Sequence, residues 1–227
     1  MTIIASALQA VRSKIAEAAA ANHRREDEVE LIAVSKGVSP EKINAAYQAG
    51  QRHFGESYVQ EATAKMAALN SLSIVWHFIG PIQSNKTRDL ARFFSWVHSV
   101  DRDKIAERLN DARPHASVPL NICLQVNISG EASKQGVAPD ALQDLAQATR
   151  LMPQLTLRGL MAIPKATPDI VLQRAQFRRL RELQETLNQK GCRLDTLSMG
   201  MSEDFVAAIA EGATMVRVGT AIFGSRK

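Results

Sequence analysis

Lys36 ends an apolar stretch, and its type and position could do chemistry. The preceding residues 31–35 (Leu-Ile-Ala-Val-Ser) fit a buried strand, and a Gly-Val-Ser-Pro turn follows the lysine. Because strand side chains alternate, Ile32, Val34 and Lys36 share one face. A low-dielectric setting lowers the pKa of a lysine, and the neutral amine can attack a carbonyl carbon to form a Schiff base. The alternative is a lysine whose ammonium group simply reaches solvent at the strand end.

Two loops near the C-terminus carry small and hydroxyl residues of the kind that bind phosphate. They are Ser198-Met199-Gly200-Met201-Ser202 and Gly219-Thr220-Ala221-Ile222-Phe223-Gly224. Small residues let backbone N–H groups approach an anion, hydroxyls add donors, and the start of a helix contributes its dipole. Alternatively, these residues form only turns and helix caps.

Arg217 lies between these loops. The strand period places it on the same face as Met215 and Gly219. An inward arginine needs an acceptor, because its charge cannot readily be removed. That acceptor is either a ligand or a carboxylate at another strand end.

An alternation of strand and helix patterns must position these residues. Apolar, β-branched runs predict eight strands, at 30–36, 52–54, 74–79, 96–100, 120–128, 155–163, 195–199 and 214–218. Amphipathic spacing and caps predict helices at 3–21, 40–50, 58–69, 84–93, 102–112, 139–151, 169–190 and 203–211, with a helical turn at 219–224. Eight such repeats favour an α/β fold, a closed (β/α)8 TIM barrel with an additional N-terminal helix, formed by residues 1–227 as one domain. An open doubly wound sheet is the alternative, although no Gly-x-Gly-x-x-Gly follows an early strand.

The composition argues against several classes of function. The net charge of +5 comes with no long basic run, and the helix at 169–190 spaces Arg178/Glu182 and Arg181/Glu185 as solvated pairs, so we expect no nucleic-acid binding. The histidines and the two cysteines show no metal-site spacing, so we expect no bound metal. No targeting segment and no run of about 18 apolar residues is visible, which predicts a cytoplasmic protein without a membrane span.

The lysine, the phosphate-type loops and the inward arginine suit one kind of ligand. It would be an aldehyde that also bears a phosphate and an aromatic ring nitrogen. Pyridoxal phosphate (PLP) meets all three demands, because a lysine can form an imine with it, the loops can hold its phosphate, and a cation can face its ring nitrogen.

Seven segments carry a resemblance to a known family: LIAVSK (31–36), RHFGESYVQE (52–61), WHFIGPIQSNK (76–86), NISGEASKQG (127–136), RGLMAI (158–163), LSMGMSEDF (197–205) and VRVGTAIFG (216–224). In order and over nearly the whole chain, they resemble the pyridoxal phosphate homeostasis protein family, single-domain relatives of the N-terminal barrel of alanine racemase. The resemblance implies that Lys36 carries the cofactor as a Schiff base and that Arg217 lies near the pyridine nitrogen. It also implies that the phosphate is held by Ser198, Ser202, Gly219 and Thr220.

One position departs from the family's pattern. Ser57 stands where the family usually has asparagine after Gly-Glu, so that asparagine's contact with the cofactor's ring or hydroxyl is not implied here. Ser57, His77 and Met201 are further candidates to contact the cofactor. For His77, a hydrogen-bonded core histidine is an equal alternative. Lys134 could act as a second amine, although a surface lysine is the simpler interpretation.

The resemblance implies a protein that binds PLP and supports its intracellular balance as a reservoir or carrier, without robust turnover of its own. Its expected partners are PLP and, transiently, apo forms of PLP enzymes, and we expect a monomer.

The alternative is an amino-acid racemase-like enzyme. Racemisation needs an acid or base on each face of the cofactor, and Lys36 serves only one. We expect no second domain to supply the other. Tyr47 lies within a predicted helix, which leaves Tyr58 as the one tyrosine expected near the mouth. A cofactor-free Schiff-base aldolase would need carboxylates beside its lysine, and the strand at 30–36 offers none there.

Overall fold

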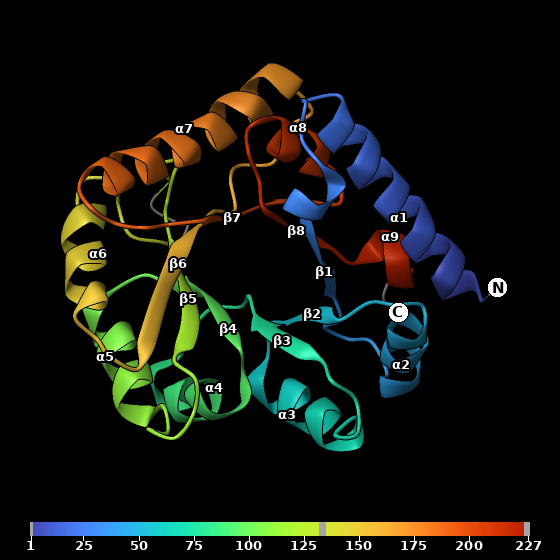
Figure 1. Ribbon diagram of the computed structural model, residues 1–227, viewed down its shortest axis with the longest axis horizontal. Coiled ribbons are helices and arrows are strands. Elements are labelled where there is room, and N and C mark those ends of the chain that lie inside the picture. The colour runs from blue at the N-terminus through green and yellow to red at the C-terminus, as the bar shows by residue number, and fades with distance from the viewer. Residues whose placement is uncertain (1, 132–134, 225–227) are drawn as a thin grey trace.

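In the computed structural model, which describes residues 2–131 and 135–224, eight parallel strands close into a barrel (Figure 1). Each strand pairs with the next along the chain, and β8 pairs with β1. The strands are β1 (Glu30–Val34), β2 (His53–Glu56), β3 (Val75–Phe78), β4 (Trp96–Val100), β5 (Leu120–Gln125), β6 (Leu155–Met161), β7 (Thr196–Met201) and β8 (Met215–Val218). The predicted (β/α)8 TIM barrel is confirmed.

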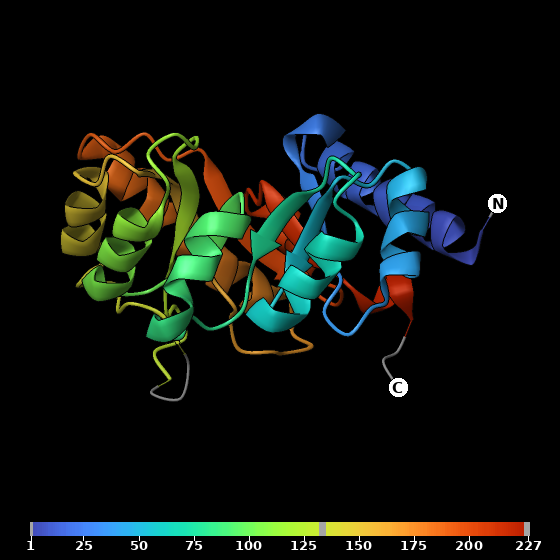
Figure 2. The ribbon, with the colours of Figure 1, turned by 90° about the horizontal axis from the view of Figure 1, so that it is seen from below.

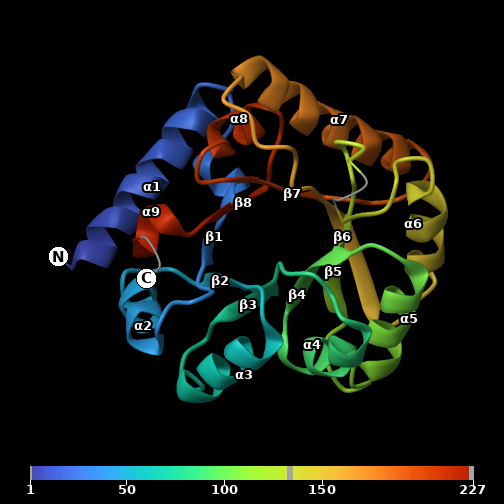
Figure 3. The same cartoon turned by 180° about the vertical axis from the view of Figure 1, so that it is seen from behind.

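Helices surround this barrel and connect its strands (Figure 3). They are α1 (Ile3–Ala20), α2 (Pro40–Gln48), α3 (Val59–Ala68), α4 (Thr87–Phe93), α5 (Asp103–Ala112), α6 (Leu142–Arg150), α7 (Ile170–Gln189), α8 (Phe205–Ala210) and α9 (Thr220–Phe223), with the short 3-10 helices η1 (Glu26–Glu28) and η2 (Ser84–Lys86). The additional N-terminal helix is α1. Its buried Leu8, Val11 and Ile15 recur at three- and four-residue steps, so one face packs inward. It lies against α8 and α9 (Figure 1).

Alternation along the strands separates two buried clusters. Val216 and Val218 of β8 belong to the main core between the barrel and its helices. Met215 of the same strand joins a smaller cluster inside the barrel, made of Ile32, Trp96, Cys123, Met161 and Met215. The side-chain alternation predicted for β1 and β8 is therefore present, because Ile32 and Met215 face the barrel interior. Arg217, two residues after Met215, lies on the same face of β8.

Strands β5 and β6 are shorter than predicted, ending at Gln125 and Met161. After β5 the chain leaves the ladder because it pairs with its own following loop. The N–H of Val137 donates to the Gln125 carbonyl oxygen at 2.8 Å, and the N–H of Asn127 donates to the Val137 carbonyl oxygen at 3.0 Å. The loop after β6 and α9 lie on the lower side of Figure 2, whereas η1, which precedes β1, lies on the upper side. The lower side is thus the C-terminal mouth of the barrel.

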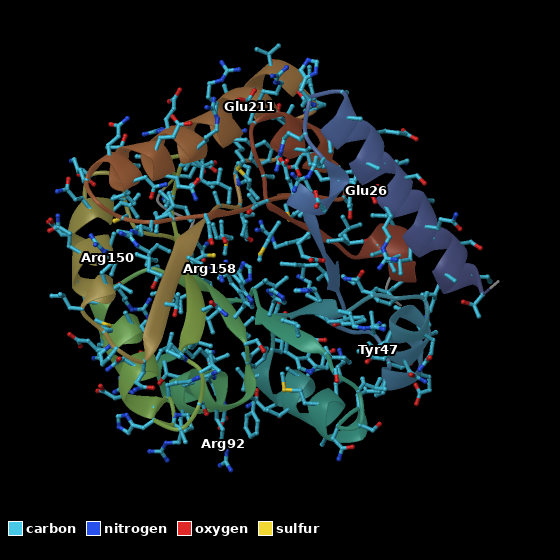
Figure 4. The ribbon with its side chains drawn as sticks, in the orientation of Figure 1. Glu26, Tyr47, Arg92, Arg150, Arg158 and Glu211 are labelled. Atoms are coloured by element: carbon cyan, nitrogen blue, oxygen red, sulfur yellow. The ribbon has the colours of Figure 1, made fainter. Side chains whose placement is uncertain are left out.

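The charged face of α7 is more than a solvated surface. Glu211, at the end of α8, is 3% exposed. Arg178, which helical spacing pairs with Glu182, donates to Glu211 at 3.0 Å, and Arg181 lies 3.7 Å from the same carboxylate while also pairing with Glu185 at 2.8 Å. Figure 4 shows Glu211 between α7 and α8. These arginines therefore tie α7 to α8.

None of the described helices is long and apolar enough to cross a membrane. Within the same residues, no group of three or more His, Cys, Asp or Glu side chains is arranged to hold a metal ion. Cys123 is fully buried, and burial raises the pKa of its thiol to about 12, which keeps it in the unreactive thiol form.

Candidate functional site

Lys36 lies in a tight turn directly after β1. The N–H of Val38 donates to the Ser35 carbonyl oxygen at 2.9 Å, and Gly37 has a φ of 70°, a conformation that side chains rarely adopt. Lys36 is partly exposed, two residues beyond Val34 on the inward phase of β1. The turn thus holds Lys36 at the C-terminal mouth, where barrels place functional residues.

A buried ionic cluster supports this turn from behind. The ammonium group of Lys65, on α3, donates to the Ser35 carbonyl oxygen at 2.6 Å, to Glu56 Oε1 at 2.8 Å and to Glu61 Oε1 at 2.6 Å. Glu61 also accepts from the Gly37 N–H at 2.5 Å. Charged partners therefore hold the turn at the backbone of Ser35 and of Gly37, the residues on either side of Lys36.

Glu56 is the most deeply buried member of this cluster. Its side chain is fully buried, Oε1 also accepts from the Ser35 hydroxyl at 2.6 Å, and Oε2 is buried with no hydrogen-bond partner. Burial raises the pKa of the Glu56 carboxyl, and the hydrogen bond from Lys65 opposes that shift. This cluster was not predicted from the sequence, because Lys65 has the position of an ordinary helix lysine until α3 packs against the turn.

Arg217 of β8 is buried beneath the mouth. Its guanidinium donates to the Ser198 carbonyl oxygen at 2.6 Å, to Ser198 Oγ at 2.7 Å and to the Ala162 carbonyl oxygen at 2.9 Å. Its acceptors here are thus carbonyl and hydroxyl oxygens of the protein. Burial lowers the pKa of Arg217 to about 10, and the Asp204 carboxylate opposes this. In the ladder Arg217 pairs with Ile32, four residues before Lys36, so it lies deeper in the barrel than the lysine.

The loops after β7 and β8 present hydroxyl groups at the same mouth. Ser202 and Thr220 are exposed, whereas Gly219, which precedes α9, is buried. Met201 ends β7 and is 37% exposed. A cavity of about 180 Å³ opens between this loop and the loop after β6, with Met201 and Ser202 in its wall.

Gly200 makes the loop after β7 possible. Its φ is 91°, and a Cβ there would lie 2.6 Å from the Cβ of Ala208 and 2.9 Å from the Cα of Phe205. The chain then turns, because the Met201 N–H donates to Asp204 Oδ1 at 2.6 Å. Close packing of β7 on α8 therefore sets where Ser202 lies.

Ser198 and His77 lie in the barrel interior. The Ser198 hydroxyl is bonded to His98 Nδ1 at 2.8 Å as well as to Arg217. Both ring nitrogens of His77 are engaged, with His53 at 2.9 Å and with His98 at 2.9 Å. His77 and Ser198 are fully buried. This geometry favours the interpretation of His77 as a hydrogen-bonded core histidine. The Ser198 hydroxyl has its hydrogen-bond partners inside the barrel.

The loop after β2 carries Ser57 and Tyr58. Ser57 is partly exposed, and the loop after β3 packs directly on it, since a Cβ on Gly80 would lie 2.3 Å from the Ser57 carbonyl oxygen. Tyr58 is 62% exposed. Lys134, the other lysine considered, lies outside the described residues.

His53 and His98 were also not predicted as part of the site. With His77 they form a row on β2, β3 and β4, in which His77 and His98 are fully buried and His53 is partly buried. The available signal was that three of the five histidines fall in three consecutive predicted strands or at their ends. The hydrogen bonds between their ring nitrogens show that the three rings meet.

Comparison with known proteins places this arrangement in a family. The alanine racemase N-terminal domain model matches residues 7–227. A pyridoxal phosphate homeostasis protein of Pseudomonas aeruginosa is 56% identical over 226 residues, covering 100% of this chain and 97% of the relative, and one of Escherichia coli is 48% identical over 229 residues, covering 100% and 98%. The structure of PipY from Synechococcus elongatus with PLP bound is 39% identical, with a TM-score of 0.86, covering 97% of this chain and 100% of PipY.

Alanine racemase from Corynebacterium glutamicum shares the fold at a TM-score of 0.75 and 15% identity, covering 98% of this chain and 61% of the racemase. The barrel and the residues at its mouth thus define a domain of the alanine racemase N-terminal type. The chain belongs to that family and, within it, to the pyridoxal phosphate homeostasis proteins.

Proposed function

We propose that this protein binds PLP at the C-terminal mouth of the barrel, as a Schiff base with Lys36. When bound, the cofactor supplies an aldehyde that a lysine amine can condense with. The donor set fits such a ligand. The amine at the rim suits an aldehyde, and the buried guanidinium below it suits a ring nitrogen. The two exposed hydroxyls suit a phosphate. The observation that carries the proposal is the placement of Lys36 in the turn after β1 and of Arg217 on the neighbouring strand β8, with both positions following the inward alternation of their strands.

Within this site each residue has a role. Ser202 and Thr220 donate hydroxyl hydrogen bonds to the phosphate, and Gly219 lets the backbone approach it. Arg217 faces the ring nitrogen, since a guanidinium carries more N–H groups than its three bonds to the protein use. Ser57 and Met201 border the mouth. Ser198 acts indirectly by orienting Arg217, because its hydroxyl is already bonded to two protein groups.

The proposed role is that of an intracellular reservoir and carrier that supports PLP homeostasis. Its support is the naming of the curated relatives at 48% and 56% identity and the PipY structure with PLP bound. The protein would act in the cytoplasm as a single-barrel monomer and would contact apo forms of PLP enzymes transiently. A cofactor at an open mouth can leave for such an acceptor.

The alternative is an amino-acid racemase-like activity. The exposure of Tyr58 and the proposed place of Arg217 both weigh against it. Tyr58, which would have to be the second acid or base, is 62% exposed, so most of its side chain lies in solvent. An arginine at the ring nitrogen disfavours protonation of that nitrogen, which weakens the withdrawal of electrons that carbanion formation needs.

Two measurements on the same loaded protein separate these functions. A PLP-free acceptor enzyme should gain activity when it is mixed with the loaded protein, whereas L-alanine should show at most slow deuterium exchange at its α-carbon. Steady racemisation on the order of 1 s⁻¹ or faster, lost in Tyr58→Phe, would establish the racemase. Failure of the acceptor enzyme to gain activity would refute the carrier role.

A further inference from the structure

A row of hydrogen-bonded side chains crosses the barrel interior from β2 to β8. His53 Nδ1 lies 2.9 Å from His77 Nε2, His77 Nδ1 lies 2.9 Å from His98 Nε2, and His98 Nδ1 lies 2.8 Å from Ser198 Oγ. Arg217 then donates to that Ser198 oxygen at 2.7 Å. Each histidine therefore uses Nδ1 toward one neighbour and Nε2 toward the other.

The two ends of the row differ in kind. Arg217 is a pure donor. At the opposite end, Nε2 of His53 lies 3.5 Å from the carboxylate of Glu30, the first residue of β1, and an ionised carboxylate only accepts. The Glu30 side chain is 45% exposed and the His53 side chain is 25% exposed, so this end opens on the N-terminal face of the barrel.

The intervening histidines are neutral. Burial lowers the pKa of His98 to about 3, with Arg217 adding to the shift, and burial together with the neighbouring histidines lowers the pKa of His77 well below its usual value. A neutral imidazole has one donor nitrogen and one acceptor nitrogen. The tautomers in such a row are therefore linked, because each donor must meet an acceptor.

One direction satisfies every group. If His53 donates from Nε2 to Glu30, its Nδ1 accepts from His77 Nε2–H, and His77 Nδ1 then accepts from His98 Nε2–H. His98 Nδ1 is left to accept the hydroxyl proton of Ser198. The Ser198 oxygen then offers its lone pairs to Arg217, so the guanidinium meets only acceptors.

The opposite direction fails at both ends. If all three histidines carried their proton on Nδ1, His98 and Arg217 would both donate to the Ser198 oxygen. The hydroxyl proton of Ser198 would then have no acceptor among these groups. His53 would meanwhile turn a bare Nε2 toward the carboxylate of Glu30. An unsatisfied buried donor and two facing acceptors are each unfavourable.

We propose that Glu30, on the N-terminal face, is a positioning residue for Arg217. It acts by fixing a one-directional hydrogen-bond chain through His53, His77, His98 and Ser198. The chain keeps the Ser198 proton away from the guanidinium and so holds Arg217 charged and in one orientation beneath the mouth. Only the connection from Arg217 to a cofactor rests on the proposed function; the chain itself does not.

The test is the tautomeric state of the histidines, read by long-range proton–nitrogen NMR on the full-length protein with ¹⁵N-labelled histidine. In the cofactor-free protein, His53, His77 and His98 should each carry the proton on Nε2, in more than ~10-fold excess over the other tautomer, as the cost of one unsatisfied buried donor implies. A proton on Nδ1 of His98 overturns the chain. Because no cofactor is present, a wrong assignment of PLP leaves this result unchanged.

Substitutions at Glu30 test its part. Glu30→Gln keeps an acceptor and should keep the Nε2–H tautomers. Glu30→Lys presents a donor, so Nδ1–H forms should appear together at the three histidines, and the Arg217 guanidinium protons should exchange faster. Glu26 is an exposed residue of η1 and is labelled in Figure 4. Glu26→Lys therefore controls for a change of charge on the same face. Wild-type tautomers in Glu30→Lys, or equal changes in Glu26→Lys, refute the role of Glu30.

Discussion

Lys65→Met removes one charge from the buried cluster behind the Lys36 turn and keeps most of the lysine's hydrocarbon stem. In the wild-type protein the Lys65 ammonium has three oxygen partners, and Glu56 is its deepest. The variant leaves the Glu56 carboxylate fully buried, with the Ser35 hydroxyl as its remaining donor in the cluster. Breaking a buried ion pair from one side usually costs about 3–5 kcal/mol of unfolding free energy.

The structure allows a sharper value. An uncompensated buried carboxylate takes up a proton rather than remaining charged. From the ordinary glutamate pKa of 4.5, protonation at pH 7 costs about 3.5 kcal/mol, at about 1.4 kcal/mol per pH unit. We therefore expect Lys65→Met to lower the unfolding free energy by about 3–4 kcal/mol at pH 7, which for a chain of this size lowers Tm by roughly 6–16 °C.

The pH dependence tests the reasoning itself. In the variant, Glu56 would hold a proton when folded and lose it on unfolding above pH 4.5, so its stability falls as pH rises. In the wild type the hydrogen bond from Lys65 opposes the burial that raises the pKa of Glu56, so the corresponding fall in stability is smaller. The cost of Lys65→Met should thus be smaller at pH 5 than at pH 7, by up to about 2.8 kcal/mol.

Urea unfolding of wild type and variant at both pH values measures these differences. Lys14→Met on the exposed face of α1 is the control and should change stability by less than about 0.5 kcal/mol. Adding Glu56→Gln to Lys65→Met should recover stability at pH 7, since a neutral amide needs no proton. A cost below about 1 kcal/mol, or one that is the same at pH 5 and pH 7, would refute the account of the cluster.

Three further predictions follow from the site and its support. Ser202→Ala and Thr220→Val should each weaken PLP binding by about one to two decades in Kd without unfolding the protein, because each removes a hydrogen bond to a charged acceptor; titration by visible absorption measures this. Gly200→Ala should destabilise the protein more than Gly191→Ala. The two glycines have similar φ values of 91° and 87°, but only a Cβ at Gly200 would lie within 4 Å of other atoms; thermal unfolding compares the two variants. As the pH falls below 6.5, the free energy of unfolding should decrease by about 1.4 kcal/mol per pH unit for His98 alone. The reason is that His98 takes up a proton in the unfolded chain but stays neutral in the folded protein, where its pKa is about 3; urea midpoints measure this.

The controls for these predictions are simple. Ser13→Ala, on the exposed face of α1, should leave PLP affinity unchanged. If the Ser202→Ala/Thr220→Val double variant binds PLP as tightly as wild type, the phosphate lies elsewhere. Equal losses in the two glycine variants would show that backbone strain alone matters. A stability that does not change between pH 6.5 and pH 5 would mean that the interior histidines are not held neutral.

Much of the fold could be read from the sequence because hydrophobic periodicity reports directly on burial. The alternation of Met215, Val216, Arg217 and Val218 predicted which residues face the barrel interior, and the structure has them so. Lys36 could be placed at the mouth for the same reason, because it extends the phase of Ile32. These inferences need only the local chain.

The supporting groups could not be predicted because they depend on packing between elements. Lys65 is buried only because α3 presses it against the turn after β1 and the end of β2. The row of histidines depends on how three strands pack together, because the ladder pairs His77 with Gly55 and Trp96 while its ring nitrogens bond to His53 and His98, two residues away from those partners. Ser198 lies in a phosphate-type motif, yet strand alternation and Arg217 direct its hydroxyl inward.

The central claim is that Lys36 holds PLP, and covalent trapping tests it most directly. The protein loaded with PLP should absorb visible light, and treatment with borohydride should abolish that absorption and fix the cofactor to one lysine. Peptide mass mapping should place the label on Lys36, and Lys36→Ala should lose the visible band even if phosphate contacts retain some cofactor. A label found mainly on Lys134 or another lysine, or an unchanged visible band in Lys36→Ala, would contradict the claim.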